Sequence, residues 1–222
     1  VIPMLPETLS NGWCSLVPNE ERGCLAVEIW IDEQGDKVKH RFVRGLMRSH
    51  ARLTYEQVED VVEGEEQDQE LPEPILAAIK HLLSAYEALD KARINRGTLD
   101  LEVPERKAVL SDDRQSIIDI RIRERLTSHK IIEEFMILAN VCAAQTLETH
   151  ERATAYRVHD APDPARIDSL RDMLKGLDIE LAKGMALAPK DFNRVLVQVD
   201  ELAYKDTIHE AILRSQSQAK YT

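Results

Sequence analysis

The spacing of apolar and polar residues predicts a β-hairpin near the start of the chain. Between Leu25 and Ile31, apolar residues occupy every second position, which is the period of a strand with one covered face. The residues Glu33–Asp36 supply a polar turn that contains glycine, and a return strand is expected from Lys37 to about Met47. The residues before this hairpin include several prolines and are expected to form an irregular lead-in.

Apolar residues that recur every three or four positions predict three helices in the middle of the chain. A short helix is expected at about Tyr55–Gly64, and longer ones at about Pro74–Gly97 and Arg125–Thr149. The apolar stripe of the first long helix consists of Ile75, Ile79, Leu82, Tyr86 and Leu89. The inner face expected for the second consists of Ile132, Phe135, Met136, Ala139, Cys142 and Ala143.

The remaining pattern predicts a mixture of strands and helices. Strands are expected at Leu99–Val103 and over Val109–Ile122, where Ser111–Asp113 interrupts the second stretch. Three short helices follow, the first at about Asp163–Gly176 and the last ending near Lys220. Because strands and helices do not alternate regularly, the pattern favours a mixed α+β domain over a doubly wound sheet.

The composition is that of an ordinary globular chain. Its 222 residues are 43% hydrophobic and 31% charged, which provides enough apolar material for a core. No apolar run approaches the roughly 18 to 20 residues that a membrane span requires, so no membrane partner is expected. The sequence begins at Val1 without a signal-like segment and is interpreted as a fragment of a cytoplasmic protein.

Three cysteines, Cys14, Cys24 and Cys142, lack the spacing of a metal site. An odd number of cysteines without such spacing favours free thiols in a reducing compartment. A disulfide between Cys14 and Cys24 is the alternative.

The acidic charge of the chain is concentrated in one segment. The formal net charge is −11, which argues against a polyanionic partner. Nine carboxylates and no Lys or Arg lie within Glu56–Glu73, so the rest of the chain carries only −2. Six cations without an acid precede this segment in Lys37–Arg52, and a second basic group consists of Arg121, Arg123, Arg125 and Lys130. These clusters are interpreted either as a surface that follows phosphates or as solvated faces.

The most specific pattern lies in three longer stretches, VIPMLPETLSNGWCSL at positions 1–16, RSHARLTYEQV at 48–58 and HKIIEEFMILAN at 129–140. In this order they resemble the RNB domain, the catalytic domain of the ribonuclease II and ribonuclease R family. The resemblance leans towards the ribonuclease R branch, and it is supported by RGTLD at 96–100, YRVH at 156–159 and LRS at 213–215. It implies that residues 1–222 are the central part of one RNB catalytic domain.

The resemblance implies hydrolysis of single-stranded RNA from its 3′ end to nucleoside 5′-monophosphates, with Mg²⁺ as the cofactor. In the family a cluster of aspartates holds the magnesium ions, and this cluster is expected upstream of Val1. An active-site arginine is expected downstream of Thr222. No catalytic or metal-binding residue is therefore expected within the chain, and the chain alone is expected to be inactive. The only adjacent aspartates, Asp112 and Asp113, are expected in a turn.

The resemblance also places three residues at the substrate. Tyr55 and Glu133 are expected near the ribose of the nucleotides at the 3′ end, because a phenol and a carboxylate can together satisfy a 2′-hydroxyl. Leu101 stands near a position where the family stacks an aromatic ring on a base, and leucine offers only dispersion contact there. The alternative for Tyr55 is a core position with its hydroxyl exposed.

On the expected helix, His129, Glu133 and Asn140 fall on one side and form a polar stripe. Glu133 is favoured over Glu134 as the functional residue, because a charge among apolar neighbours is costly to bury without a role or a partner. The alternative is a structural pair of Glu133 with His129 or with Arg125.

Four arginines of the first basic cluster are candidates for contacts to the RNA backbone, namely Arg41, Arg44, Arg48 and Arg52. Arg157 and His159 lie in a family-like segment and are expected to pack in the core. The expected partner is single-stranded RNA rather than DNA. Two alternatives are a non-catalytic RNA-binding or protein-binding module on the same scaffold and an acidic interaction domain unrelated to RNA.

Overall fold

The computed structural model describes residues 3–64, 71–101, 104–111, 113, 115–182 and 187–222. These residues form two compact units. The first unit comprises the chain up to Ala92 together with Arg125–Arg152, and the second comprises Arg93–Glu124 together with Ala153–Thr222. Helices and strands occur in both units, which confirms the expected α+β class. No helix in the described ranges is long and apolar enough to cross a lipid bilayer.

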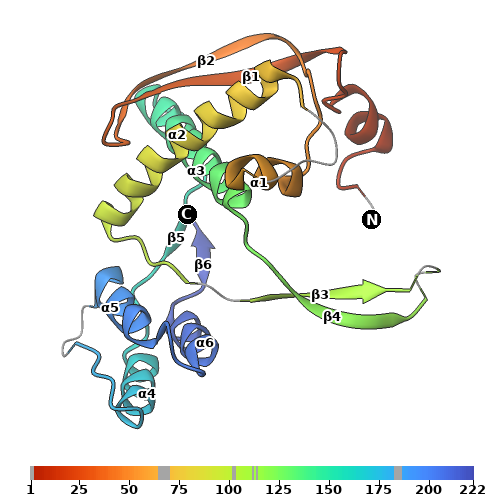
Figure 1. The fold of residues 1–222 in the computed structure, drawn as a ribbon. Coiled ribbons are helices and arrows are strands. Elements are labelled where there is room, and N and C mark those ends of the chain that lie inside the picture. Colours follow the sequence, from red (N-terminus) through yellow and green to blue (C-terminus); the bar gives the residue numbers. More distant parts are fainter. Residues whose placement is uncertain (1–2, 65–70, 102–103, 112, 114, 183–186) are drawn as a thin grey trace. The chain divides into compact units, whose positions relative to one another are not determined.

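An antiparallel hairpin of two long strands lies in the first unit (Figure 1). Strand β1 (Glu21–Ile31) pairs with β2 (Lys37–Arg48) in a register that sets Leu25 opposite Arg44. The expected hairpin is confirmed, but β1 begins at Glu21 rather than Leu25 because the pairing continues to the end of β2. The lead-in before it contains a short π-helix, η1 (Thr8–Trp13).

Three helices form in the middle of the chain at the positions that the apolar periodicity predicts. Helix α1 (Tyr55–Glu63) ends at Gly64, whose φ of 74° is left-handed and therefore suits glycine. Helices α2 (Glu73–Arg96) and α3 (Thr127–Thr149) are the two long helices. Helix α3 contacts both α1 and β1.

The buried faces of the two long helices differ in part from the expected ones. Helix α2 buries three members of its predicted stripe, Ile79, Tyr86 and Leu89, whereas Leu82 is 42% exposed. The predicted inner face of α3 is confirmed at Cys142, which is buried, but it is wrong at Ile132 and Met136, which are 41% and 59% exposed. Besides Cys142, α3 buries Ser128, Ile131 and Glu134, which are not part of the predicted face. Since α3 is apolar over much of its circumference, its contacts with α1 and β1 decide which side is covered.

A carboxylate and a glycine fix the turn between β1 and β2. The Asp32 side chain accepts hydrogen bonds from the backbone N–H groups of Gln34 and Asp36 at 3.0 and 2.8 Å. Gly35 has a φ of 81° and lies against α2, where an added Cβ would come within 2.0 Å of the Ala88 carbonyl oxygen. Only glycine fits this close approach, so the turn depends on a contact that its own sequence does not reveal.

The second unit contains two short sheets and three short helices. One sheet pairs β3 (Glu105–Leu110) with β4 (Ile117–Arg123), and the other pairs β5 (Arg157–His159) with β6 (Ala219–Tyr221). The helices are α4 (Pro164–Lys175), α5 (Pro189–Val199) and α6 (Lys205–Ser215). Their apolar faces share one core, which includes Leu174, Phe192, Val195, Val199, Ile208 and Ile212.

Two expectations for the second unit are wrong. Residues 99–101 do not form a strand, because Leu99 and Leu101 pack against the helical core instead of a neighbouring strand. The rest of that expected strand, Glu102 and Val103, lies outside the described residues. The last helix ends at Ser215 rather than near Lys220, since the following residues pair with β5 as strand β6.

The three cysteines are free thiols, as the sequence predicts. Cys14 is exposed, Cys24 is half-buried, and Cys142 is buried on α3. Burial raises the pKa of the Cys142 thiol, so this side chain stays protonated and packs as a small apolar group.

Candidate functional site

Tyr55 and His129, from two of the three motif stretches, stack on each other in the first unit. Their ring centroids lie 4.1 Å apart with an angle of 24° between the ring planes. Tyr55 is the first residue of α1 and is 39% exposed, so its ring is open to solvent on part of its surface. The alternative of a core position for Tyr55 is therefore wrong.

A capping box holds Tyr55 in place at the start of α1. The Thr54 hydroxyl accepts a hydrogen bond from the Gln57 backbone N–H at 3.2 Å. The Gln57 side chain in turn accepts one from the Thr54 backbone N–H at 2.9 Å. This reciprocal pair satisfies two backbone donors at the helix start and fixes the direction in which α1 presents its first residue.

The His129 ring is oriented by the backbone at the start of α3. Its Nδ1 accepts a hydrogen bond from the Leu126 backbone N–H at 3.2 Å. A neutral imidazole whose Nδ1 accepts carries its proton on Nε2, so the ring offers a donor at its other end. The stack thus presents a phenol and an imidazole from two helices at one place.

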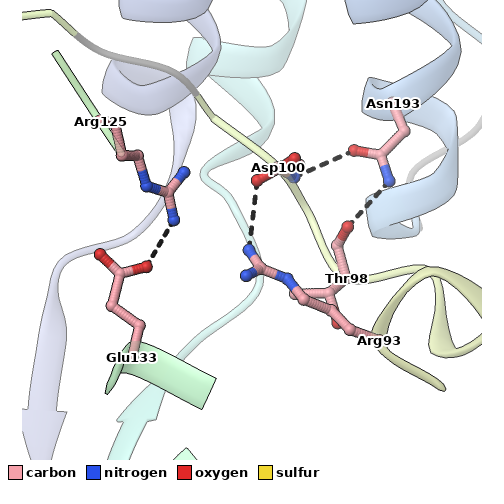
Figure 2. A network of polar contacts seen from close by, with 6 residues as sticks. All are labelled: Arg93, Thr98, Asp100, Arg125, Glu133 and Asn193. Carbon is pink, nitrogen blue, oxygen red and sulfur yellow. Dashed lines mark hydrogen bonds and ion pairs between the residues drawn. The ribbon is translucent and has the colours of Figure 1, made fainter. Parts of the chain in front are cut away.

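Glu133 lies one helical turn after His129 and forms an ion pair with Arg125 (Figure 2). An Arg125 guanidinium nitrogen donates to Glu133 Oε2 at 2.5 Å, and the Glu133 side chain is 47% exposed. The structural pair expected as the alternative is therefore present. A carboxylate held through one oxygen keeps acceptor sites on the other, so the pair does not prevent a second contact.

Burial does not favour Glu133 over Glu134, and the expectation that it does is wrong. Glu134 is the buried carboxylate, with 3% of its surface exposed, whereas Glu133 and Asn140 are exposed. The apolar neighbours Ile132 and Met136 are themselves exposed, so they do not bury the charge of Glu133. A role for Glu133 must consequently rest on its exposure next to His129 rather than on a cost of burial.

A buried carboxylate that the sequence patterns did not single out joins α1 to α3. Glu59 Oε1 accepts from the Thr127 backbone N–H at 2.8 Å, and Oε2 accepts from that of Ser128 at 2.7 Å. Burial acts to raise the pKa of Glu59, but the hydrogen bonds from Ser128 and Thr127 outweigh it and lower the pKa. One feature of the sequence could have indicated a distant capping residue such as Glu59. Leu126 stands at the N-cap of α3 and has no side-chain acceptor for the first N–H groups of the helix.

The arginines of β2 do not form a single row. Strand alternation puts Arg44 and Arg48 on one face of the hairpin and Arg41 on the other. Arg41 pairs with Glu28, and this hydrogen bond lowers the pKa of the Glu28 carboxyl. Arg48 pairs with Glu21 at 3.3 Å, whereas Arg44 lies opposite Leu25.

Arg52, the fourth candidate, is exposed in the irregular stretch between β2 and α1. It therefore belongs to neither face of the hairpin. The sequence could have predicted that the arginines of β2 lie on two faces. Alternate residues of a strand face opposite sides, and Arg41 has an odd number whereas Arg44 and Arg48 have even numbers.

Leu101 lies in the second unit, in a loop fastened to α5. Its side chain is partly buried against the helical core. The Asp100 backbone N–H donates to Asn193 Oδ1 at 3.3 Å, and the Asn193 amide donates to the Thr98 carbonyl at 2.9 Å (Figure 2). Arg93 adds an ion pair to the Asp100 carboxylate at 3.2 Å. Packing already uses part of the Leu101 side chain, which limits the surface it can offer to a base.

Arg157 and His159 are exposed, so the expectation that they pack in the core is wrong. Both belong to β5, where alternation turns them to the same face and buries neither. His159 Nδ1 forms a hydrogen bond with the Ser217 carbonyl at 2.9 Å, which fastens β5 to the segment before β6.

The described residues do not contain a site that fits a metal ion. Among them, no group of three or more His, Cys, Asp or Glu side chains is placed to hold one. Asp113 lies in a turn, as expected, and forms a hydrogen bond with the Ser111 hydroxyl at 2.5 Å, whereas Asp112 is outside the described residues. We therefore derive no metal-dependent step from this chain.

Comparisons with known proteins match the whole chain. The family model of the RNB domain matches residues 1–222. Ribonuclease R of Vibrio cholerae is 38% identical over 221 residues, which cover 100% of this chain and 27% of the relative. Ribonuclease R of Escherichia coli shows the same identity and the same coverage. The chain thus spans about a quarter of the length of these curated relatives.

Solved structures with a similar fold include ribonuclease R of Mycoplasma genitalium. Its apo form superimposes with a TM-score of 0.91 at 25% identity, over 99% of this chain and 34% of that one. The same protein has been solved in complex with ribose-methylated single-stranded RNA and with double-stranded RNA. Yeast Ssd1, described as a pseudonuclease, shares the fold with a TM-score of 0.70 at 15% identity.

Proposed function

Because the chain belongs to the RNB domain family, we propose that it acts in a 3′-to-5′ exoribonuclease that hydrolyses single-stranded RNA to nucleoside 5′-monophosphates. The observation that carries the proposal is the Tyr55–His129 stack with the exposed Glu133 one turn further along α3. This arrangement suits the ribose at the 3′ end, since a 2′-hydroxyl both donates and accepts hydrogen bonds.

In this proposal Tyr55 and Glu133 contact the 2′-hydroxyl, and His129 supports the Tyr55 ring. DNA lacks this hydroxyl, so the Tyr55 phenol and the Glu133 carboxylate would each lose the hydrogen bond to the sugar. DNA is therefore the poorer ligand in this proposal. The RNA complexes of the Mycoplasma relative support an RNA ligand. Arg44, Arg48 and Arg52 are the proposed contacts to the RNA backbone, and Leu101 adds an apolar contact to a base.

The residues of this chain bind and orient RNA in the proposal and do not cleave it. Magnesium ions would supply charge stabilisation for such hydrolysis, and clustered carboxylates would be needed to hold them. The described residues lack such a cluster, so in the proposal the aspartates and the arginine of the reaction come from outside residues 1–222.

The test measures degradation by the full-length gene product that contains residues 1–222. With 5′-labelled single-stranded RNA we expect a ladder that shortens from the 3′ end and released mononucleotides. Glu133→Ala should lower the preference for RNA over a matched DNA strand by about tenfold, because one hydrogen bond to the 2′-hydroxyl is lost. An equal loss of activity on both strands would instead indicate damaged folding and would contradict the assignment of Glu133.

A non-catalytic RNA-binding module is the second candidate. The fold also occurs in yeast Ssd1, a described pseudonuclease, so the fold by itself does not guarantee catalysis. Tight, salt-sensitive RNA binding by the full-length protein without release of mononucleotides would favour this candidate over the exonuclease.

A further inference from the structure

We propose that Glu59 is a positioning residue for RNA selectivity, because it clamps the first turn of α3 to α1 and so holds Tyr55, His129 and Glu133 in register. The inference rests on the proposed function, since it concerns how the same ribose-binding site is kept in shape. Glu59 itself is not expected to touch RNA, because only 6% of its surface is exposed.

The first turn of α3 needs an acceptor that its own sequence does not supply. The initial N–H groups of a helix have no partner within the helix, and Leu126 at the N-cap offers no side-chain oxygen. Glu59 reaches from α1 and accepts from the N–H groups of Thr127 and Ser128 with one oxygen each. Two bonds from one rigid carboxylate restrain both the distance and the rotation between the helices.

The same two helical turns also carry the aromatic stack. Glu59 follows Tyr55 by four residues, so both side chains lie on one face of α1. His129 follows Ser128 directly, and Glu133 lies one turn further along α3. A shift of the first turn of α3 would therefore move the His129 ring away from Tyr55 and change the position of Glu133 in the same step.

The clamp requires the ionised carboxylate of Glu59, because only this form offers two acceptor oxygens to the two N–H groups. A buried carboxylate is costly unless hydrogen bonds and a favourable field compensate it, and both are present at the positive end of the α3 dipole. The isosteric amide of glutamine has one acceptor oxygen only, and its NH₂ group would face a backbone N–H. Glu59→Gln therefore preserves volume and removes one arm of the clamp.

The experiment compares RNA and DNA strands of equal sequence with the full-length protein. We expect Glu59→Gln to lower the ratio of kcat/KM for RNA over that for DNA by about tenfold, mainly through a higher KM for RNA. Glu63→Gln is the matched control, because Glu63 carries the same charge at the exposed end of α1. This control should stay within about twofold of the parent on both strands.

A second measurement follows the stack directly and does not depend on activity. The ring protons of His129 feel the ring current of Tyr55, so their NMR chemical shifts should change in Glu59→Gln and stay unchanged in Glu63→Gln. Glu59→Asp keeps the carboxylate and should recover part of the RNA selectivity and part of the parent His129 shifts. This variant keeps the proposal testable if Glu59→Gln folds poorly.

The outcomes separate the two proposals. A folded Glu59→Gln protein with unchanged selectivity and unchanged His129 shifts overturns the role of Glu59 while the proposed function stands. A parent protein that degrades no RNA, or that treats RNA and DNA alike, overturns the proposed function and with it the selectivity role. Failure of Glu59→Asp to recover either signal would likewise contradict the clamp.

Discussion

Three glutamates of the first unit show how one residue type takes different roles. Glu133 is exposed and paired with Arg125, whereas Glu134 next to it is buried. Glu59 is buried too, but it caps a helix that begins 68 residues later in the chain. Hydrogen bonds from two backbone N–H groups keep Glu59 ionised at neutral pH, although burial alone would favour the protonated form.

The stability that Glu59 contributes should depend on pH. Its pKa is lower in the folded protein than the ordinary value of 4.5, so its contribution is fully present above 4.5 and is lost as the pH falls through the lower folded value. We expect Glu59→Gln to reduce the free energy of unfolding by about 2 kcal/mol at pH 7 and by progressively less as the pH falls below 4.5.

Urea unfolding of the 222-residue chain at several pH values measures this difference. Trp13 and Trp30, the two tryptophans of the chain, both lie in the first unit, so tryptophan fluorescence reports on the unit that contains Glu59. Glu63→Gln provides the comparison, with little effect at any pH. A difference between parent and Glu59→Gln that stays constant down to about pH 3 would argue against an ionised cap.

At the scale of elements, the hairpin depends on a glycine whose importance comes from a helix. Gly35 and Gly64 both have a positive φ, of 81° and 74°. A Cβ on Gly64 would meet no atom within 4 Å, whereas one on Gly35 would collide with the Ala88 carbonyl of α2. The two positions therefore separate the cost of backbone strain from the cost of a clash.

We expect Gly64→Ala to destabilise the first unit by about 1 kcal/mol, which is the strain of a left-handed alanine. Gly35→Ala should cost about 3 kcal/mol or more, because the turn or α2 must also move. Tryptophan fluorescence in urea measures both values. Equal costs at the two positions would show that the Ala88 carbonyl of α2 does not block the space that a Cβ on Gly35 would occupy.

The two faces of β2 lead to a further prediction about RNA binding. Arg44 lies opposite Leu25 and has no ion pair among the described residues, whereas Arg41 on the other face is paired with Glu28. We expect Arg44→Gln to reduce the slope of log K against log salt by about 0.7, the value for one phosphate contact to a single strand. Arg41→Gln should leave this slope unchanged.

Fluorescence anisotropy of the 222-residue chain with a labelled single-stranded oligoribonucleotide gives both slopes. The two variants carry the same change of charge, so a general effect of net charge would alter them equally. A larger change with Arg41→Gln than with Arg44→Gln would place the backbone contacts on the opposite face of the hairpin.

At the scale of the whole molecule, the net charge of −11 is a poor guide to the partner. Nine of the 40 acidic residues fall within Glu56–Glu73, and residues 65–70 of this segment are outside the described residues. The Mycoplasma relative has been solved with RNA, and the proposed partner of this chain is RNA in spite of the acidic total. Association with a polyanion depends on the local face that it meets, because screening confines each charge to about 8 to 10 Å at physiological salt.

The sequence by itself determined the family, the α+β class, the first hairpin and the extents of α1, α2 and α3. Apolar periodicity, turn residues and caps act over a few neighbouring positions, so they can be recognised in a single sequence without knowledge of the fold. The motif stretches placed Tyr55 and His129 among the residues of interest in the same way, although not their contact.

Only the tertiary structure decided which sides of these elements are covered and what holds them together. It turned Glu134 rather than Glu133 inward, set Gly35 against Ala88, and made Glu59 the cap of α3. Each of these outcomes depends on a partner far away in the sequence. Local patterns fix the backbone conformation of a segment, whereas burial and hydrogen bonding are fixed by the surfaces that folding brings together.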